Sequence, residues 1–187
     1  GLIFNLSLLA YFKYADFAIE NFNAAFGQDV SLLHILLPLG ISFFTFQKIG
    51  YLVDCYRGLV DEHDPRRFML FVLFFPQLIA GPIVHHAEII PQLKRHQDRP
   101  VPNPKLIAQG LFFIVIGLFK KVLIADLIGA YADLGFSRVA DLTFVDSWTT
   151  ALAYSLQLFF DFSAYSETAV GLALLFGIRL PQNFISP

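Results

Sequence analysis

The stretch "LQLFFDFSAYSETAVGLALLFG" (residues 156–177) decides how this chain folds, because it places two carboxylates inside a long apolar run. It belongs to residues 147–178, in which Asp161 and Glu167 are the only charged side chains. A transmembrane helix needs about 20 predominantly apolar residues, and this run is longer than that. We therefore expect a membrane-spanning helix that carries two ionisable groups.

The composition of the whole chain agrees with a membrane protein. Of the 187 residues, 56% are hydrophobic and 15% are charged, whereas soluble domains carry roughly 25% charged residues. The net charge of −2 and the lack of a basic run with interleaved aromatic residues argue against nucleic-acid binding. A single cysteine, Cys55, excludes an internal disulfide, and no basic or histidine neighbour activates its thiol. The fold class predicted is all-α, a polytopic integral membrane protein.

Apolar runs divide the chain into segments that we expect to reach into or across the bilayer. The expected segments are about 1–13, 30–53, 68–84, 106–126 and 147–178. The chain begins inside an apolar run without a methionine and ends abruptly at residue 187. We interpret it as one transmembrane domain, a fragment of a longer protein.

The basic residues of the connections predict the topology, because Lys and Arg accumulate on the cytoplasmic side. Residues 14–31 and 126–147, poor in Lys and Arg, are expected outside. The two connections that flank residues 68–84 are both basic: they hold Arg57, Arg66 and Arg67, and Lys94, Arg95, Arg99 and Lys105. Both lie inside if 68–84, which Pro76 and Pro82 interrupt, dips in and returns as a re-entrant segment. The alternative is a short, kinked span.

A polar stripe runs along the helix predicted for residues 147–178. At 3.6 residues per turn, the stripe residues fall within an arc of about 80°; they are Tyr154, Gln157, Asp161, Tyr165 and Thr168. Ionisable groups in membrane helices usually face the bundle interior or a water-filled path. Tyr154, Gln157, Asp161 and Tyr165 are therefore candidates for lining or bracing a reaction path. The alternative is that Asp161 only accepts interhelical hydrogen bonds that fix packing.

The second carboxylate of this helix, Glu167, points elsewhere. It follows Asp161 by six residues, which turns it by about 120° around the helix. An acid–base dyad of the two is not expected. Glu167 is expected to meet a basic group on another helix or to lie near the membrane interface.

The histidines do not have the spacing of a metal site. They are His34, His63, His85, His86 and His96, without an HExxH or HxxxH pattern. No metal is therefore predicted. His85 and His86 directly follow "AGPIV" and are candidates for the cytoplasmic mouth of a path; a solvated pair of loop side chains is the simpler alternative.

Five stretches, in order along nearly the whole chain, resemble the membrane-bound O-acyltransferases (MBOAT), and within them the bacterial branch similar to alginate O-acetyltransferases. They are "LPLGISFFTFQKIGYLVDCYRG" (37–58), "FFPQLIAGPIV" (74–84), "EIIPQL" (88–93), "GLFKKVLIADLIG" (117–129) and "FFDFSAYSETAVGLALLFGIRLPQNFISP" (159–187). The departures are Ala164, where the family usually has Gly, and Gln182, where Glu is common.

The resemblance implies a multi-pass enzyme of the bacterial inner membrane, with a ring of helices and re-entrant or broken elements. It implies acetyl transfer from a cytoplasmic thioester, acetyl-CoA or another acyl donor, to hydroxyls of an exported polysaccharide such as alginate, or to periplasmic acetyl-relay proteins. No bound cofactor is implied. The family's catalytic histidine is expected downstream of Pro187, so this fragment is expected to hold no catalytic residue and to be inactive alone.

Two other classes of protein remain open on the residues alone. One is a transporter or channel with Asp161 as its midplane carboxylate, and the other is a non-catalytic membrane scaffold.

Overall fold

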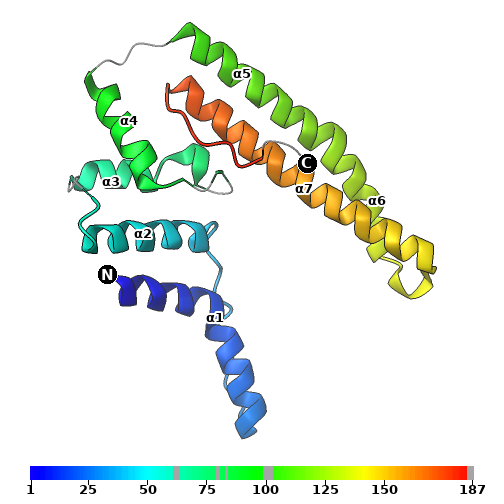
Figure 1. Cartoon of the computed structure of the whole chain (residues 1–187). Coiled ribbons are helices and arrows are strands. Elements are labelled where there is room, and N and C mark those ends of the chain that lie inside the picture. The colour runs from blue at the N-terminus through cyan, green and yellow to red at the C-terminus, as the bar shows by residue number, and fades with distance from the viewer. Residues whose placement is uncertain (61–63, 79–80, 83, 99–102, 185–187) are drawn as a thin grey trace. The chain divides into compact units, whose positions relative to one another are not determined.

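A computed structural model describes residues 1–60, 64–78, 81–82, 84–98 and 103–184, and all regular structure in these ranges is helical (Figure 1). The elements are α1 (Leu2–Phe26), α2 (Ile41–Tyr56), α3 (Pro65–Val72), the 3₁₀ turn η1 (Phe75–Gln77), α4 (His86–Asp98), α5 (Pro104–Phe119), the π-helical η2 (Lys120–Ala125), α6 (Asp126–Phe136), the 3₁₀ turn η3 (Val139–Asp141) and α7 (Phe144–Leu175). The all-α prediction is confirmed.

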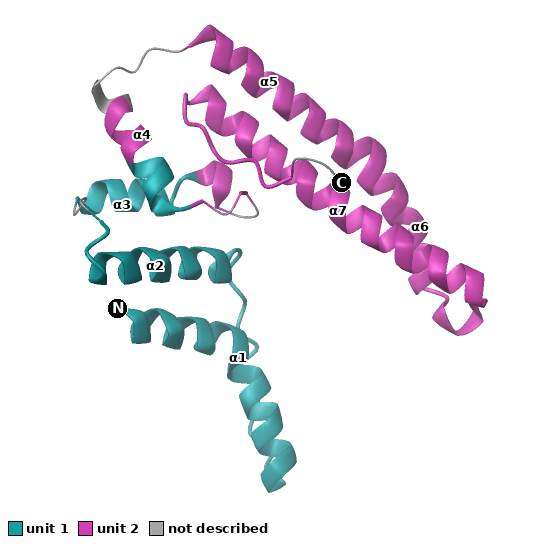
Figure 2. Cartoon of the chain, in the orientation of Figure 1, with its two compact units in different colours: residues 1–74, 85–90 teal, residues 75–84, 91–187 magenta. Residues whose placement is uncertain are grey.

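The chain forms two compact units (Figure 2). Unit 1 consists of residues 1–74 and 85–90, and unit 2 of residues 75–84 and 91–187. The chain passes from one unit to the other after Phe74, after Val84 and after Ile90, and the last of these boundaries lies within α4.

Helix α1 of unit 1 lies against α2 and extends much further than the apolar segment 1–13. It continues through Asp16 and Glu20, and none of its residues is buried. No Gly or Pro interrupts it before Gly27, whose φ of 62° ends the helix in the left-handed conformation. The expected connection at residues 14–31 is therefore wrong over its first part, which is helical.

Helix α2 begins later than the apolar segment 30–53. Residues 28–38 have no regular secondary structure, and α2 starts at Ile41, after Pro38 and after Gly40 with φ 72°. Proline disfavours a helical conformation at the residue before it, here Leu37, so no continuous helix runs through Pro38 from the apolar residues before it.

Residues 65–86 do not form one continuous helix. Pro65 follows the cap Asp64 and opens α3, which ends at Val72. The 3₁₀ turn η1 follows, and the described residues from there to His86 have no further helix. This agrees with the expected interruption of the segment 68–84. Its re-entry into the membrane stays a prediction.

Unit 2 is built on two long antiparallel helical rods. Helices α5, η2 and α6 continue into one another from Pro104 to Phe136, and α7 packs along all three (Figure 1). The first part of the expected connection 126–147 is thus helical, which corrects the prediction. A capping box of Thr143 and Asp146 starts α7.

Glycines let the two rods approach closely. A Cβ atom on Gly110 would lie 2.7 Å from the carbonyl oxygen of Gly171, and one on Gly171 would lie 2.6 Å from that of Gly110. Small residues at such contacts are characteristic of helix packing in membranes, where close backbone contact replaces the hydrophobic driving force.

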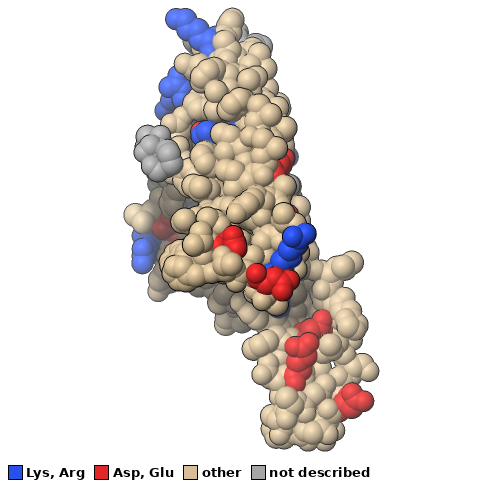
Figure 3. All heavy atoms as spheres, turned by 90° about the vertical axis from the view of Figure 1, so that its right-hand side faces the viewer, with Lys and Arg blue, Asp and Glu red and all other residues tan. Residues whose placement is uncertain are grey.

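The outer surface of the rods is largely apolar. Figure 3 shows one face on which charged side chains are few. Phe112, Leu127 and Trp148 are 63%, 67% and 58% exposed. By length and hydropathy, α1 and α7 are the two described helices able to cross a membrane. The polytopic ring of the resemblance stays a prediction.

Candidate functional site

The two carboxylates of α7 each bind a lysine of η2. Lys120 Nζ lies 2.6 Å from Glu167 Oε1, and Lys121 Nζ lies 2.9 Å from Asp161 Oδ1. Lys121 also lies 2.8 Å from Asp126 Oδ1. The expectation that Glu167 meets a basic group on another helix is confirmed. These ion pairs explain how an apolar helix retains two carboxylates.

The helical geometry accounts for the use of consecutive lysines. Neighbouring residues on a helix point about 100° apart, close to the angle of about 120° between Asp161 and Glu167 on the facing helix. The lysines also open a π-helical turn, Lys120–Ala125. Such π-helical turns inside α-helices are found frequently at functional sites.

Most of the predicted polar stripe faces the opposite rod. The ring of Tyr154 meets that of Phe136 edge-on at 5.4 Å between centroids. A Cβ atom on Gly129 would lie 2.7 Å from Gln157 Nε2. With Asp161 bound to Lys121, three of the four path candidates contact α6 or η2. Asp161 thus makes a bond between the rods; lining a reaction path and fixing the helix packing both stay predictions for it.

The fourth path candidate, Tyr165, lines a pocket of unit 2. Its side chain is about one-third exposed, and with Thr168 it borders a mainly apolar cavity of about 250 Å³. Phe75, Pro76 and Leu78, in and beside η1, form the other wall. An interrupted segment thus lines a cavity, which is where irregular backbone is tolerated at membrane depth.

A second cavity in unit 2, of about 180 Å³, is more polar. It is lined by Phe113, Ser166, Glu167, Val170, Gln182, Asn183 and Phe184. The Oε2 atom of Glu167 is buried and has no hydrogen-bond partner within the described part of the chain. The Lys120 pair therefore uses one oxygen of this carboxylate and leaves the other beside the cavity.

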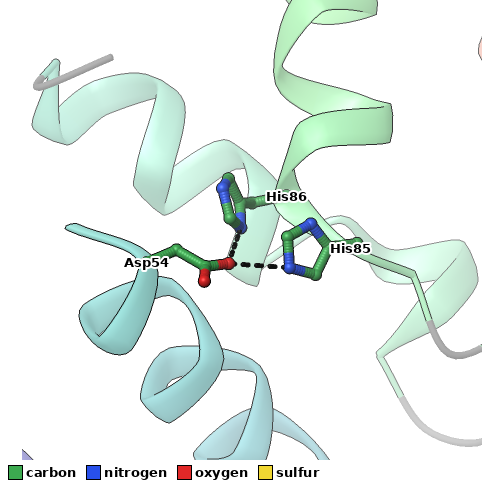
Figure 4. Close-up of side chains that lie close together, drawn as sticks. All are labelled: Asp54, His85 and His86. Atoms are coloured by element: carbon green, nitrogen blue, oxygen red, sulfur yellow. Dashed lines mark ion pairs between the residues drawn. The ribbon is translucent and has the colours of Figure 1, made fainter. Parts of the chain in front are cut away.

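In unit 1, His85 and His86 converge on one carboxylate oxygen (Figure 4). His85 Nε2 lies 2.8 Å and His86 Nδ1 lies 3.7 Å from Asp54 Oδ2. Asp54 is in the last turn of α2, and the histidines precede and open α4. Tyr51, one turn before Asp54, presents its ring edge-on to His86 at 5.3 Å.

The two histidines differ in environment. His86 is buried, whereas 55% of the His85 side chain is exposed. Burial lowers the pKa of His86 below its usual value, and the neighbouring His85 lowers this pKa further, while Asp54 acts in the opposite direction. The interpretation as a solvated loop pair is thus wrong for His86, because Asp54 and Tyr51 enclose it.

Sequence reasoning did not include Asp54 in this cluster. The available signal was a charged residue directly at the end of an apolar run, but its partners lie 31 and 32 positions further along. Position at a cytoplasmic mouth stays a prediction for His85 and His86. Of the other histidines, His34 is exposed, His63 lies outside the described residues, and the His96 side chain is not described.

The helical fold, the apolar surface and the charge pairs between apolar helices agree with a helical membrane protein. The model of the membrane-bound O-acyltransferase family (MBOAT) matches residues 60–187. The chain belongs to this family of acyltransferases.

Proteins similar in sequence to this chain carry the names of enzymes that transfer acyl groups. A peptidoglycan O-acetyltransferase of Helicobacter pylori is 47% identical over all of this chain and 40% of the relative's length. A probable alginate O-acetylase, AlgI, of Pseudomonas aeruginosa is 43% identical over all of this chain and 36% of the relative. A teichoic acid D-alanyltransferase of Lacticaseibacillus rhamnosus is 28% identical over all of this chain and 52% of that protein. The chain thus spans 40% or less of the first two relatives.

Proposed function

We propose that the whole protein to which this chain belongs is a membrane O-acetyltransferase that acetylates hydroxyl groups of an exported polysaccharide. The observation that carries this proposal is the family match together with two relatives, 47% and 43% identical, whose names both state O-acetylation of a glycan. The D-alanyltransferase, at 28% identity, also transfers a small acyl group to a polymer by its name.

The proposed reaction takes the acetyl group from a thioester at the cytoplasmic face, acetyl-CoA or a carrier-bound acyl group. The acceptor is a polysaccharide outside the inner membrane, reached directly or through a periplasmic acetyl-relay protein. Donor and acceptor must approach one general base from two sides, which requires a path through the protein. We place that base, a histidine, beyond Pro187, as the family resemblance implies.

Within this path, the proposed role of the present residues is to line and support it. Tyr165 borders the apolar cavity beside η1, and Tyr154, Gln157 and Asp161 brace the facing rods. His85 and His86 are proposed to lie near the cytoplasmic mouth. A multi-pass position in the inner membrane belongs to the same proposal.

The transporter alternative has no support in the comparisons, and Asp161 is engaged by Lys121. A non-catalytic scaffold would show no acetyl transfer, so a measurement of acetyl transfer by the full-length protein tests that alternative.

The test uses the full-length protein, expressed in a strain from which its gene is deleted. We expect labelled acetyl groups to appear as base-labile esters on the cell's peptidoglycan or exopolysaccharide, each fraction being measured separately. Replacing the histidine beyond Pro187 by alanine should abolish the label. Unlabelled glycan despite normal membrane expression, or full labelling by the histidine variant, would reject the proposal.

A further inference from the structure

We propose that Asp54, His85 and His86 form a binding site for a divalent metal ion of the zinc type. This proposal does not rest on the proposed acyltransferase function. The sequence predicted no metal, because its histidines lack the spacing of a metal site and the third ligand, Asp54, lies 31 positions before His85.

The three ligand atoms lie close enough together for one zinc ion to bind all of them after small side-chain adjustments. Asp54 Oδ2, His85 Nε2 and His86 Nδ1 all lie within 4.8 Å of one another. With bonds of about 2.0–2.2 Å in a tetrahedral arrangement, zinc ligands are separated by about 3.3 Å. The two measured distances to Asp54 Oδ2, 2.8 Å and 3.7 Å, lie on either side of that value. Side-chain adjustments of about half an ångström bring both to it.

The chemistry of the three groups selects the ion. Two imidazoles and one carboxylate form a donor set that zinc uses in proteins, often with water at the fourth position. Mg²⁺ and Ca²⁺ prefer sets made only of oxygen atoms. The exposed side of His85 provides the way in for the ion and room for that water.

The surrounding contacts hold the ligands in place. His86 is buried between Tyr51 and His85, with ring centroids 5.3 Å and 4.2 Å away. The Asp54 side chain is 13% exposed. The side chains of His86 and Asp54 are therefore held in place before an ion binds, which lowers the loss of conformational entropy on binding.

Two contacts of His85 change when the ion binds. The 2.8 Å contact between His85 Nε2 and Asp54 Oδ2 is replaced by a bond from each atom to the ion, and a backbone contact of His85 Nδ1 changes as well. The backbone N–H of Ala87 lies 3.5 Å from His85 Nδ1, which accepts from it. An imidazole bound to metal through Nε2 carries its proton on Nδ1, so this contact is lost. A distance of 3.5 Å exceeds the usual 2.7–3.2 Å range of a hydrogen bond. The loss is therefore small, and water can accept the proton at this exposed ring.

The expected consequence is a link between the last turn of α2 and the start of α4. An ion that binds the folded protein and not the unfolded chain stabilises it by mass action. The melting temperature should therefore rise with zinc concentration, independently of any acyl transfer.

The experiment uses the full-length protein in detergent, purified without a polyhistidine tag and freed of metal with EDTA. Co²⁺ is titrated in as a coloured substitute for zinc, and visible absorption is recorded. We expect a saturable spectrum from one ion per chain that Zn²⁺ displaces. His85→Ala should weaken this binding at least tenfold, and Asp54→Asn should do the same. The matched control is His34→Asn, which removes an exposed histidine elsewhere in unit 1, and asparagine tolerates the local φ of 49°.

Two results would overturn the proposal: no Co²⁺ spectrum at a hundredfold excess of the ion, or equal spectra for the wild type and His85→Ala. Either would leave a hydrogen-bonded His–Asp cluster only. His85 decides the test if the buried His86 cannot be replaced without unfolding, because the exposed His85 side chain contributes little to the core. Other histidines of the full-length protein are present in both the wild type and His85→Ala, so any Co²⁺ that they bind does not affect the difference between the two spectra.

Discussion

Lys120 donates to Glu167 across two neighbouring helices at 2.6 Å, while the next residue, Lys121, reaches Asp161 six positions earlier on the same α7 helix. The Lys120 and Glu167 side chains are only 27% and 16% exposed. Two adjacent cations thus hold two carboxylates that point in different directions. The arrangement fixes the register of η2 against α7.

Removing the carboxylate of Glu167 should destabilise the protein more than removing the whole pair. Glu167→Leu leaves the partly buried ammonium of Lys120 unpaired, and we expect a loss of about 1–3 kcal/mol in the free energy of unfolding, the cost of leaving a buried polar group without a partner. The double variant Lys120→Met/Glu167→Leu should recover most of it, because no charge is then left alone. Unfolding of the full-length protein by sodium dodecyl sulfate measures both. A double variant as unstable as the single one would contradict this account.

A methyl group at the closest contact of the two rods should separate them. Gly171→Ala places a Cβ atom 2.6 Å from the Gly110 carbonyl oxygen, and overpacking of this kind costs about 1–3 kcal/mol. The control is Gly50→Ala in α2, where nothing lies within 4 Å of the added atom. The melting temperature should fall for the first variant and stay or rise for the second. Equal effects would show that helix propensity, not close packing, dominates.

Loss of the cap should loosen the start of α7. Thr143→Ala removes both side-chain bonds with Asp146, and we expect a cost of about 1 kcal/mol. Thr143→Ser keeps the hydroxyl and should behave like the wild type. Hydrogen exchange of the first turn of α7 reports the effect locally. Unchanged exchange in Thr143→Ala would argue that this cap is not formed in the membrane.

Filling the apolar cavity beside Tyr165 tests the proposed path. Leu172→Phe adds volume to a residue that lines this cavity of about 250 Å³, so acetyl transfer by the full-length protein should fall severalfold if substrate passes there. Leu158→Phe makes the same change on α7 at a position that is 56% exposed, and transfer should persist. Melting temperatures establish that both proteins are folded. Unchanged transfer in Leu172→Phe would remove this cavity from the path.

Periodicity predicted the orientation of side chains on α7 well. The 3.6-residue repeat separated Asp161 from Glu167 and placed Gln157 and Asp161 on a face that meets the opposite rod, as the structure confirms for both. These predictions succeed because a long helix sets the direction of each side chain by its own geometry.

Helix ends were predicted less well. Hydropathy stopped the first segment at residue 13 and began the second at residue 30, whereas the helices end at Phe26 and begin at Ile41. Backbone signals decide these positions: the left-handed glycines Gly27 and Gly40, and Pro38. These glycines and this proline are visible in the sequence, but a hydropathy profile does not take backbone conformation into account.

Composition and periodicity alone establish an apolar helical protein and the separation of the two carboxylates, since both depend on the local chain. The family resemblance rests separately on five motifs found in order along the sequence. The partners of those carboxylates, Lys120 and Lys121, and the convergence of Asp54 with His85 and His86 depend on tertiary structure. The physical reason is that charged groups between apolar helices need a partner. How segments far apart in sequence pack together decides which partner is near.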